Sequence, residues 1–268
     1  MKLSVIVPTH NRRALLERKL RALERELGDF EIIVVADGCA DGTLDFLRGF
    51  NTRLDVRVLE LPGVGAAAAR NAGVRASSGR VLLFSDDDVI PRSGWVLAHA
   101  NAHAEKNVVA VGRLELPAQL RDGASFLGPK VLWWNATGAN SSLSRALFDR
   151  AGGYDESFSE YGGEDPDLGF RLLKLGANFV FLPSAVAEHW DEGFLGSLRK
   201  KARAAGIAHV RVWRKHNDAR IAWALGVHPV LLGLKRVLLP VLSPLLGSRG
   251  VYEREYARGA TDALRGKA

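Results

Sequence analysis

The sequence has 268 residues, of which 47% are hydrophobic and 25% are charged, with 37 Lys and Arg against 30 Asp and Glu. This balance excludes an intrinsically disordered chain, which combines low hydrophobicity with high net charge. The single cysteine excludes a disulfide scaffold and a multi-cysteine zinc site. The length corresponds to one large domain, or to one domain with an appendage.

The charge is unevenly distributed along the chain. Residues 1–191 carry 22 basic and 25 acidic side chains, a net charge of −3. Residues 192–268 carry 15 basic and 5 acidic side chains, a net charge of +10. We therefore expect a near-neutral domain over 1–191 and a basic C-terminal region over 192–268. The partner of that basic region is expected to be anionic, such as a membrane surface or a nucleic acid.

Strand and helix patterns alternate over residues 1–112. Strands are predicted at 3–7, 31–35, 56–61, 81–85 and 108–112, the first of them buried, with helices between them. The first helix is predicted to follow an Asn11 cap and to bury Leu16, Leu20, Leu23 and Leu27. The alternation predicts an α/β fold, a mostly parallel sheet flanked by helices.

Polar side chains follow three of the predicted strands. Pro8 and Thr9 follow the first strand, Asp37 the second, and Asp86, Asp87 and Asp88 the fourth. Because ligands of open α/β sheets bind beyond the carboxyl ends of the strands, these residues predict one site. Side chains two residues apart in an extended turn point the same way, so Asp86 and Asp88 can hold one Mg²⁺ or Mn²⁺. The alternative is a solvated acidic loop.

A second acidic cluster, Glu164 and Asp165, begins a helix predicted at 165–175. It predicts a general base on a rigid helix end, or simply a favourable charge at the helix dipole. His189 follows a strand predicted at 178–182 and is either structural or a metal ligand. Arg70, on an Ala-rich helix after a Gly-containing loop, can meet a phosphate with its planar guanidinium.

The C-terminal region combines a basic helix with an apolar segment. A helix at about 195–215 is predicted to bury Leu198, Ala202, Ala205 and Val210. In residues 221–247 the longest uncharged stretch has 14 residues, fewer than the roughly 20 of a membrane span, and prolines interrupt it. Three readings stay open: two helices buried against the body, an interfacial membrane hairpin, or a span.

Targeting signals point to the cytoplasm. The first apolar run has five residues and ends at Pro8, which is too short for the apolar region of a secretory signal. With a single cysteine, the chain is expected in the cytoplasm, as a peripheral protein at the inner face of the membrane if the basic region binds lipid.

The ordered motifs resemble glycosyltransferase family 2, whose members have the GT-A fold. They cover roughly residues 1–190 and comprise Ser4–Arg12, Val34–Gly38, Ala69–Gly73, Asp86–Asp88, Gly152–Phe158 and Gly163–Asp165. The resemblance implies a Rossmann-like GT-A domain over 1–191, with a nucleotide-binding half over about 1–112 and an acceptor-side half over about 113–191. Residues 192–268 would form a helical basic appendage.

The resemblance also implies roles for the candidate residues. Pro8, Thr9 and Asp37 would hold the base and ribose, and Arg70, Asp86 and Asp87 would lie at the nucleotide sugar. Asp86 and Asp88 would form the Asp-x-Asp metal site for Mn²⁺ or Mg²⁺, with His189 as a further ligand. Asp165 would be the catalytic base, with Glu164 beside it. One departure from the family pattern is Ala36, where an acidic residue is common.

The function expected from the resemblance is inverting, metal-dependent transfer of a sugar from a nucleoside-diphosphate sugar to a hydroxyl of a glycan or lipid-linked acceptor. A sugar-nucleotide nucleotidyltransferase is the first alternative, but it calls for a Gly-rich, basic loop where this chain has Pro8-Thr9-His10-Asn11. A non-enzymatic nucleotide- or nucleic-acid-binding module is the second, and it leaves both acidic clusters without a purpose.

Overall fold

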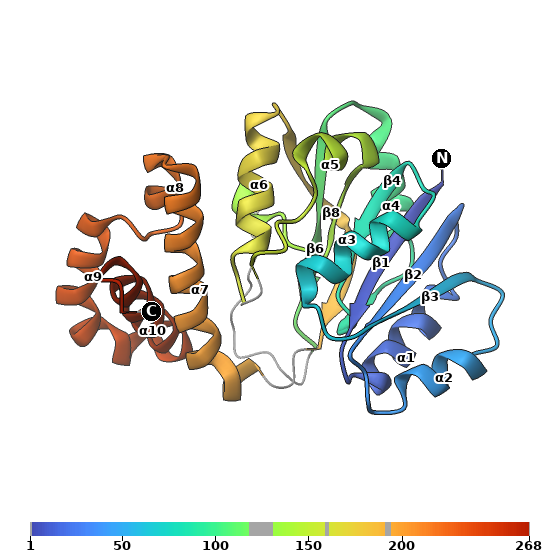
Figure 1. Ribbon diagram of the computed structural model, residues 1–268, viewed down its shortest axis with the longest axis horizontal. Helices are drawn as coiled ribbons and strands as arrows, with labels where there is room; N and C mark the ends of the chain where they lie inside the picture. Colours follow the sequence, from blue (N-terminus) through green and yellow to red (C-terminus); the bar gives the residue numbers. More distant parts are fainter. Residues whose placement is uncertain (1, 118–130, 159–160, 191–193, 268) are drawn as a thin grey trace.

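The computed structural model describes residues 2–117, 131–158, 161–190 and 194–267 (Figure 1). These residues contain an eight-stranded sheet in the order β3-β2-β1-β4-β7-β6-β8-β5. The strands are β1 (Leu3–Thr9), β2 (Phe30–Asp37), β3 (Asp55–Leu61), β4 (Val81–Phe84), β5 (Val89–Pro91), β6 (Val108–Glu115), β7 (Ser141–Ser144) and β8 (Asn178–His189).

Helices cover both faces of this sheet and continue into a C-terminal helical region (Figure 1). Those of the first 190 residues are α1 (Arg13–Leu23), α2 (Thr43–Gly49), α3 (Ala66–Ala76), α4 (Trp95–Asn101), α5 (Arg145–Ala151) and α6 (Glu164–Lys174), with the short helices η1 (Ala102–Ala104) and η3 (Trp133–Asn135). The C-terminal region contains α7 (Phe194–His216), α8 (Ala219–Ala224), α9 (Pro229–Leu242), η4 (Ser243–Leu246) and α10 (Gly247–Leu264).

The sheet is mostly parallel, as the alternating pattern predicts. Strands β3, β2, β1 and β4 are parallel neighbours, and β6 is parallel to β8. Strand β7 runs antiparallel between β4 and β6, and β5 antiparallel to β8. Sequence analysis missed β5 and β7. The first has three residues and the second is the polar run SSLS, so their extended state depends on pairing partners and not on an apolar pattern.

The alternation of side chains along β1 divides the core into two layers. Ile6 faces α3, where it packs with Ala67, Ala69 and Val74, while Val5 and Val7 face Leu16 and Leu20 of α1. Helix α3 packs closely, because a Cβ at Gly73 would collide with Ile6. Small residues in this helix therefore set the distance at which Arg70 stands from the sheet.

Two details at α1 differ from the sequence prediction. Leu16, Leu20 and Leu23 are buried, but Leu27 is 68% exposed because the helix ends at Leu23. Asn11 is not the helix cap. It has a positive φ of 53°, and its side-chain oxygen accepts a hydrogen bond from the backbone N–H of Ala40.

The C-terminal region has a core of its own. Helices α7 and α10 pack along each other, and the four residues predicted to face inward on α7 are all buried. The region joins the body at Asp167 of α6, a fully buried carboxylate that accepts hydrogen bonds from Lys215 Nζ at 2.6 Å and His216 Nε2 at 2.8 Å. The predicted boundary between 191 and 192 lies outside the described residues and stays a prediction.

The apolar segment 221–247 is not a pair of buried helices. Ile221, Leu232 and Leu239 are buried, but Val237 and Leu245 are 71% and 82% exposed. Over the described residues, one segment, Ala219–Leu242, is long and apolar enough by composition to cross a membrane, and most of it is not buried.

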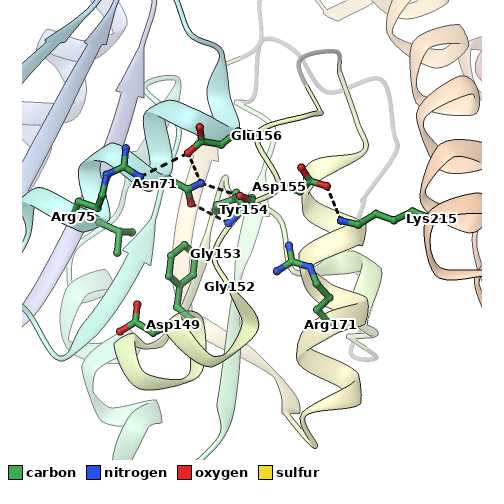
Figure 2. A pocket seen from close by; sticks show the side chains of 12 residues that line it. Asn71, Arg75, Asp149, Gly152, Gly153, Tyr154, Asp155, Glu156, Arg171 and Lys215 are labelled. Atoms are coloured by element: carbon green, nitrogen blue, oxygen red, sulfur yellow. Dashed lines mark hydrogen bonds and ion pairs between the residues drawn. The ribbon is translucent and has the colours of Figure 1, made fainter.

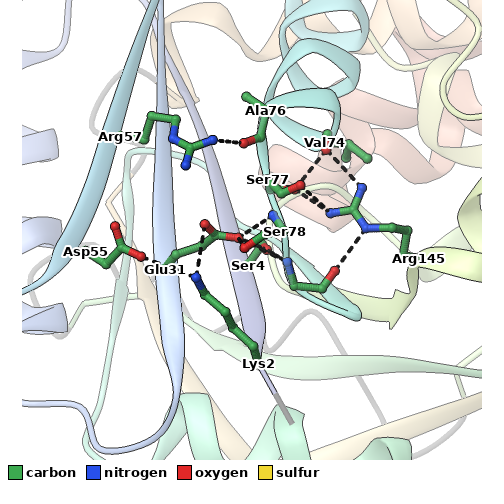
Figure 3. A network of polar contacts seen from close by, with 11 residues as sticks. Lys2, Ser4, Glu31, Asp55, Arg57, Val74, Ala76, Ser77, Ser78 and Arg145 are labelled. Carbon is green, nitrogen blue, oxygen red and sulfur yellow. Dashed lines mark hydrogen bonds and ion pairs between the residues drawn. The ribbon is translucent and has the colours of Figure 1, made fainter.

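A buried carboxylate ties the amino ends of the central strands together (Figure 3). Glu31 of β2 is 1% exposed and accepts hydrogen bonds from Ser4 Oγ at 2.7 Å, Ser78 Oγ at 2.9 Å and the backbone N–H of Gly79 at 3.0 Å. Burial alone would raise the pKa of Glu31, but these donors and Lys2 lower it to about 2.

Replacing Glu31 by Gln should lower the free energy of unfolding at pH 7 by about 2–3 kcal/mol, because the donors lose a charged acceptor. Because the pKa of Glu31 is lower in the folded than in the unfolded protein, this stabilisation is fully present above the unfolded-state pKa of 4.5. It is lost as the pH falls toward the folded-state pKa of about 2. Urea titrations of both proteins between pH 2 and 7 measure it. Glu60→Gln, at an exposed position of β3, is the control; equal stability of wild type and Glu31→Gln at pH 7 would contradict the assignment.

Candidate active site

Asp37 organises the loop that leads into α3. This residue is 7% exposed. Its Oδ1 accepts hydrogen bonds from the backbone N–H groups of Gly63 and Val64 at 2.9 and 2.7 Å, and its Oδ2 accepts one from that of Gly65 at 2.8 Å. Both glycines have positive φ, which directs these N–H groups toward the carboxylate. The nucleotide contact expected of Asp37 stays a prediction, and the shown role is to shape this loop.

The acidic cluster after β4 is neutralised by two arginines, one just before α1 and one on α3. Asp86 Oδ1 lies 2.8 Å from Nη2 of Arg70 on α3. The carboxylates of Asp87 and Asp88 lie 3.2 and 2.6 Å from Nη1 of Arg12, which precedes α1. Asp86 and Asp88 therefore follow the sheet edge as predicted, while each contacts a cation of its own.

Burial and neighbouring charges give Asp87 and Asp88, the two buried members of this cluster, different pKa values. Burial raises the pKa of Asp87 to about 6. Burial also acts to raise the pKa of Asp88, but His189 and Arg12 outweigh it and lower the value to about 2. Asp88 is thus firmly ionised at neutral pH, as a ligand of a hard cation must be.

His189 reaches Asp88 through the pairing of β5 with β8. The antiparallel register sets His189 opposite Val89, so that Nε2 of the histidine lies 3.5 Å from Oδ1 of Asp88. That buried Oδ1 accepts no hydrogen bond. Within the described ranges no three His, Cys, Asp or Glu side chains form a metal-ligating group. The orphaned, ionised oxygen beside an imidazole nevertheless fits a divalent cation.

Lys19 fixes the turn that carries the acidic cluster. This α1 side chain is fully buried, and its Nζ donates to Ser85 Oγ and to the backbone carbonyl of Val89, each at 2.6 Å. The two contacts bracket the three aspartates. Burial lowers the pKa of Lys19 to about 8, against the opposing effect of the neighbouring carboxylates. A buried cation below the turn offsets part of the repulsion among them.

Arg70 joins the two acidic clusters. It is 4% exposed and reaches Asp86 with Nη2 and Oε1 of Glu164 with Nη1 at 3.4 Å, while its guanidinium lies 5.4 Å from the centre of the Tyr154 ring. A Cβ at Gly138 would collide with this guanidinium in its observed position, so glycine leaves room for it there. Segments near residues 70, 86, 138 and 164 thereby meet at one point.

Asp165 lies beside this junction at the N-terminus of α6. Its Oδ1 accepts a hydrogen bond from the backbone N–H of Gly138 at 2.9 Å. Burial, and then the negative charge of Glu164, raise the pKa of Asp165 to about 7, although Arg70 and the Gly138 N–H act to lower it. A carboxylate with a pKa near neutrality can both take and release a proton at physiological pH.

Comparison with known proteins agrees with this arrangement. Residues 4–123 match the family described as Glycosyl transferase family 2, and residues 118–190 match the N-terminal domain of galactosyltransferase. Residues 4–123 of the chain thus belong to glycosyltransferase family 2.

Two relatives illustrate the similarity of this chain to named enzymes. Validoxylamine A glucosyltransferase from Streptomyces hygroscopicus subsp. jinggangensis is 34% identical over 217 residues, covering 63% of this chain and 51% of that protein. Pre-mycofactocin glycosyltransferase from Mycobacterium tuberculosis is 30% identical over 278 residues, covering 92% and 56%. The chain thus spans about half the length of these relatives.

Solved structures show that the chain has the GT-A fold. A mannosyltransferase from Pyrobaculum calidifontis, in complex with GDP-Man and Mn²⁺, superposes with a TM-score of 0.67 at 19% identity, covering 99% of this chain and 88% of that one. TarS from S. aureus, residues 1–349 with UDP-GlcNAc, gives a TM-score of 0.56 at 18% identity, covering 100% and 93%.

A cavity of about 640 Å³ lies beside Tyr154, and its lining also includes Asn71, Asp155 and Lys215 (Figure 2). Asn71 holds its wall in place: the amide donates to the Tyr154 carbonyl at 2.8 Å and to Glu156 at 2.9 Å, and its oxygen accepts from the Tyr154 N–H. Lys215 of α7 reaches Asp155 across the cavity at 2.7 Å. The C-terminal region therefore helps to enclose a cavity whose wall includes Tyr154, and the ring of Tyr154 also contacts Arg70.

Several residues of the site escaped sequence analysis. Lys19 stands three residues after Leu16 and four before Leu23, so a lysine within an apolar helical stripe was the available signal. Arg12 belongs to a motif segment, but nothing in its spacing points to Asp88. Gly138 carries no local signal, because its importance comes from the guanidinium against which it packs.

Replacing Arg70 by Gln should raise the pKa of Asp165 above 7, because a nearby positive charge that favours the carboxylate is removed. Site-resolved ¹³C NMR titration of the Asp165 carboxyl group measures the shift. Arg70→Lys keeps the charge and is the matched control, expected to stay closer to wild type. An unchanged or lower pKa in the Gln variant would show that Arg70 does not act on Asp165.

Proposed function

We propose that this chain is an inverting, metal-dependent glycosyltransferase that moves a sugar from a nucleoside-diphosphate sugar to a hydroxyl of a glycan or lipid-linked saccharide. The observation that carries the proposal is the bridge made by Arg70 between Asp86 and Glu164. It sets an acidic cluster suited to a metal diphosphate beside Asp165, a carboxylate suited to proton transfer.

The donor half would lie at the carboxyl ends of β1, β2 and β4. Pro8, Thr9 and Asp37 are proposed to meet the nucleoside, and Asp86, Asp88 and His189 to hold Mn²⁺ or Mg²⁺. When bound, the cation would neutralise the charge that develops on the diphosphate leaving group. The GDP-Man and Mn²⁺ complex of the Pyrobaculum mannosyltransferase and the UDP-GlcNAc complex of TarS support this donor class.

The arginines at the acidic cluster would contact both the aspartates and the diphosphate of the donor. Arg12 and Arg70 each neutralise a carboxylate in the structure. Both have planar guanidinium groups that bind phosphate oxygens in the same geometry as carboxylate oxygens. On donor binding, each is expected to exchange part of its contact with aspartate for contact with the diphosphate.

The acceptor half would lie between α6 and the body. Asp165 is proposed to accept the proton of the attacking hydroxyl, while the Gly138 N–H holds one of its oxygens in place. Direct attack on the side of the sugar opposite the leaving diphosphate inverts the anomeric centre. No second carboxylic acid is required, because a diphosphate leaves without the protonation that a glycosidase provides.

The cytoplasmic, membrane-peripheral location expected from the sequence belongs to the same proposal. A lipid-linked acceptor presents its sugar at a membrane surface, and the +10 charge of residues 192–268 suits an anionic leaflet. A glycan acceptor in solution makes no such demand.

Nucleotide binding tests the donor site. Titration calorimetry with UDP, GDP and dTDP, each with and without Mn²⁺, should show one nucleotide that binds tightly only with the metal. Asp88→Ala should weaken that binding at least about tenfold, because an ionised ligand is lost. Asp45→Asn, at an exposed site on α2, is the control. Metal-independent binding, or equal binding by Asp88→Ala, would contradict the proposed metal site.

The pH dependence of transfer tests the base. Because Asp165 acts unprotonated, the turnover rate should fall about tenfold per pH unit below about 7 and level off above it. Asp165→Asn should lose roughly 10²–10⁴ in turnover and keep metal-dependent nucleotide binding. Asp45→Asn, at an exposed site on α2, should keep the wild-type rate. A fully active Asn variant would exclude Asp165 as the base.

A further inference from the structure

An apolar ridge runs along the outer side of α9 and η4. Its large side chains recur with helical spacing, and each is between 42% and 82% exposed: Val230, Leu234, Val237, Leu238, Val241, Leu242, Leu245 and Leu246. On the inner side of the same helix Leu232 and Leu239 are buried, and Lys235 pairs with Glu253 of α10 at 2.7 Å. The helix is therefore anchored in the C-terminal core, with its ridge directed away from it.

The position of the ridge leaves it accessible. Helix α9 lies on the side of α7 that faces away from the sheet (Figure 1). Contiguous exposed apolar surface of this kind is uncommon on a soluble monomer and marks a site of interaction. The donor and acceptor sites proposed above make no use of it.

The charge around the ridge selects an anionic partner. Residues 219–252 contain no Asp or Glu, while Arg236 and Arg249 are exposed within and just after the ridge. In the described part of the C-terminal region each acidic side chain is neutralised within 2.7 Å by a basic one: Asp218 by Arg220, Glu253 by Lys235, Glu255 by Arg258 and Asp262 by Arg203. The region therefore presents an excess of positive charge.

The geometry of the segment favours lying in a membrane interface over crossing it. Helix α9 has 14 residues, which give about 21 Å of length, short of the roughly 30 Å hydrocarbon core. The turn after α8 separates the two helices, with the N–H groups of Val227 and His228 both donating to the Ala222 carbonyl. With one side packed on α10, only the ridge side is available to lipid.

We propose that the apolar ridge of α9 and η4 inserts into the surface of an anionic lipid bilayer, with Arg236 and Arg249 at the level of the headgroup phosphates. Apolar burial would supply the affinity and the cations the preference for anionic lipid. The binding itself depends only on this surface, and its use in bringing the enzyme to a lipid-linked acceptor rests on the proposed function.

Flotation with vesicles tests the ridge directly. The full chain is mixed with vesicles of phosphatidylcholine alone, or with 30% phosphatidylglycerol, at low and high salt. Wild type should float with the anionic vesicles and should bind the neutral ones more weakly. The double variant Val237→Ser, Leu245→Ser should bind at least about tenfold less, because two of the three most exposed apolar side chains of the ridge are lost.

Matched variants distinguish lipid binding by the ridge from nonspecific binding by any exposed apolar side chain. Leu27→Ser removes an equally exposed leucine from the body and should bind like wild type. Arg236→Gln, Arg249→Gln should lose the preference for anionic lipid and keep the weaker neutral binding. Metal-dependent nucleotide binding is measured on every variant, so that a failure of lipid binding with intact nucleotide binding overturns the ridge proposal and leaves the donor site standing.

Two results would overturn the proposal. One is wild-type protein that binds neither vesicle, or a ridge variant that binds as wild type does. The other is a concentration-dependent dimer, seen by analytical ultracentrifugation and abolished by the ridge variant, in a protein without lipid affinity. That outcome would make the ridge an interface between two copies of the chain.

Discussion

The buried guanidinium of Arg70 is the interaction on which the site depends. It lies between Asp86, which follows β4, and Glu164, which begins α6, almost eighty residues later in the chain. Without a cation there, three carboxylates including Asp165 would share one poorly solvated space, and their repulsion would be uncompensated. Small residues make this position available: Gly73 lets α3 approach the sheet, and Gly138 leaves room for the guanidinium.

The same pattern of compensation extends across the carboxyl edge of the sheet. Arg12 neutralises Asp88 from one side, and Lys19 supports the turn from within the core. Because the carboxylates of this site already contact basic side chains, they keep fixed positions. A metal diphosphate would enter by exchanging partners with arginines and not by ordering a loose loop, which lowers the entropic cost of binding.

The C-terminal region has two sides with different roles. Its inner side joins α7 to the body through Asp167, Lys215 and His216, and it closes one wall of the cavity beside Tyr154. Its outer side carries the apolar ridge on α9. One rigid attachment therefore relates the proposed acceptor side of the enzyme to the surface that we propose meets lipid. The packing of α7 against α6 sets how the proposed acceptor side is oriented relative to the apolar ridge.

The sequence by itself determined the elements and the order of the motifs. Apolar alternation located β1, β2, β3, β4 and β6, and ordered motifs led to the family and to Asp86, Asp88 and Asp165. These features are visible because they depend on local spacing: period-two or helical patterns, and polar groups at strand ends. The burial of Leu198 and Ala202 on α7 followed from the same periodicity.

Tertiary structure alone decided which charges meet. Strands β5 and β7 exist through their pairing partners, and the register of β5 with β8 is what brings His189 to Asp88. Arg70, Gly138 and Glu164 come together through helix packing, and the pKa of Asp165 follows from that burial and from its neighbours. An apolar helix reads the same in sequence whether it is buried or exposed. Only the packing of α9 on α10 determined which of its leucines face inward, because burial depends on contacts between residues distant along the chain.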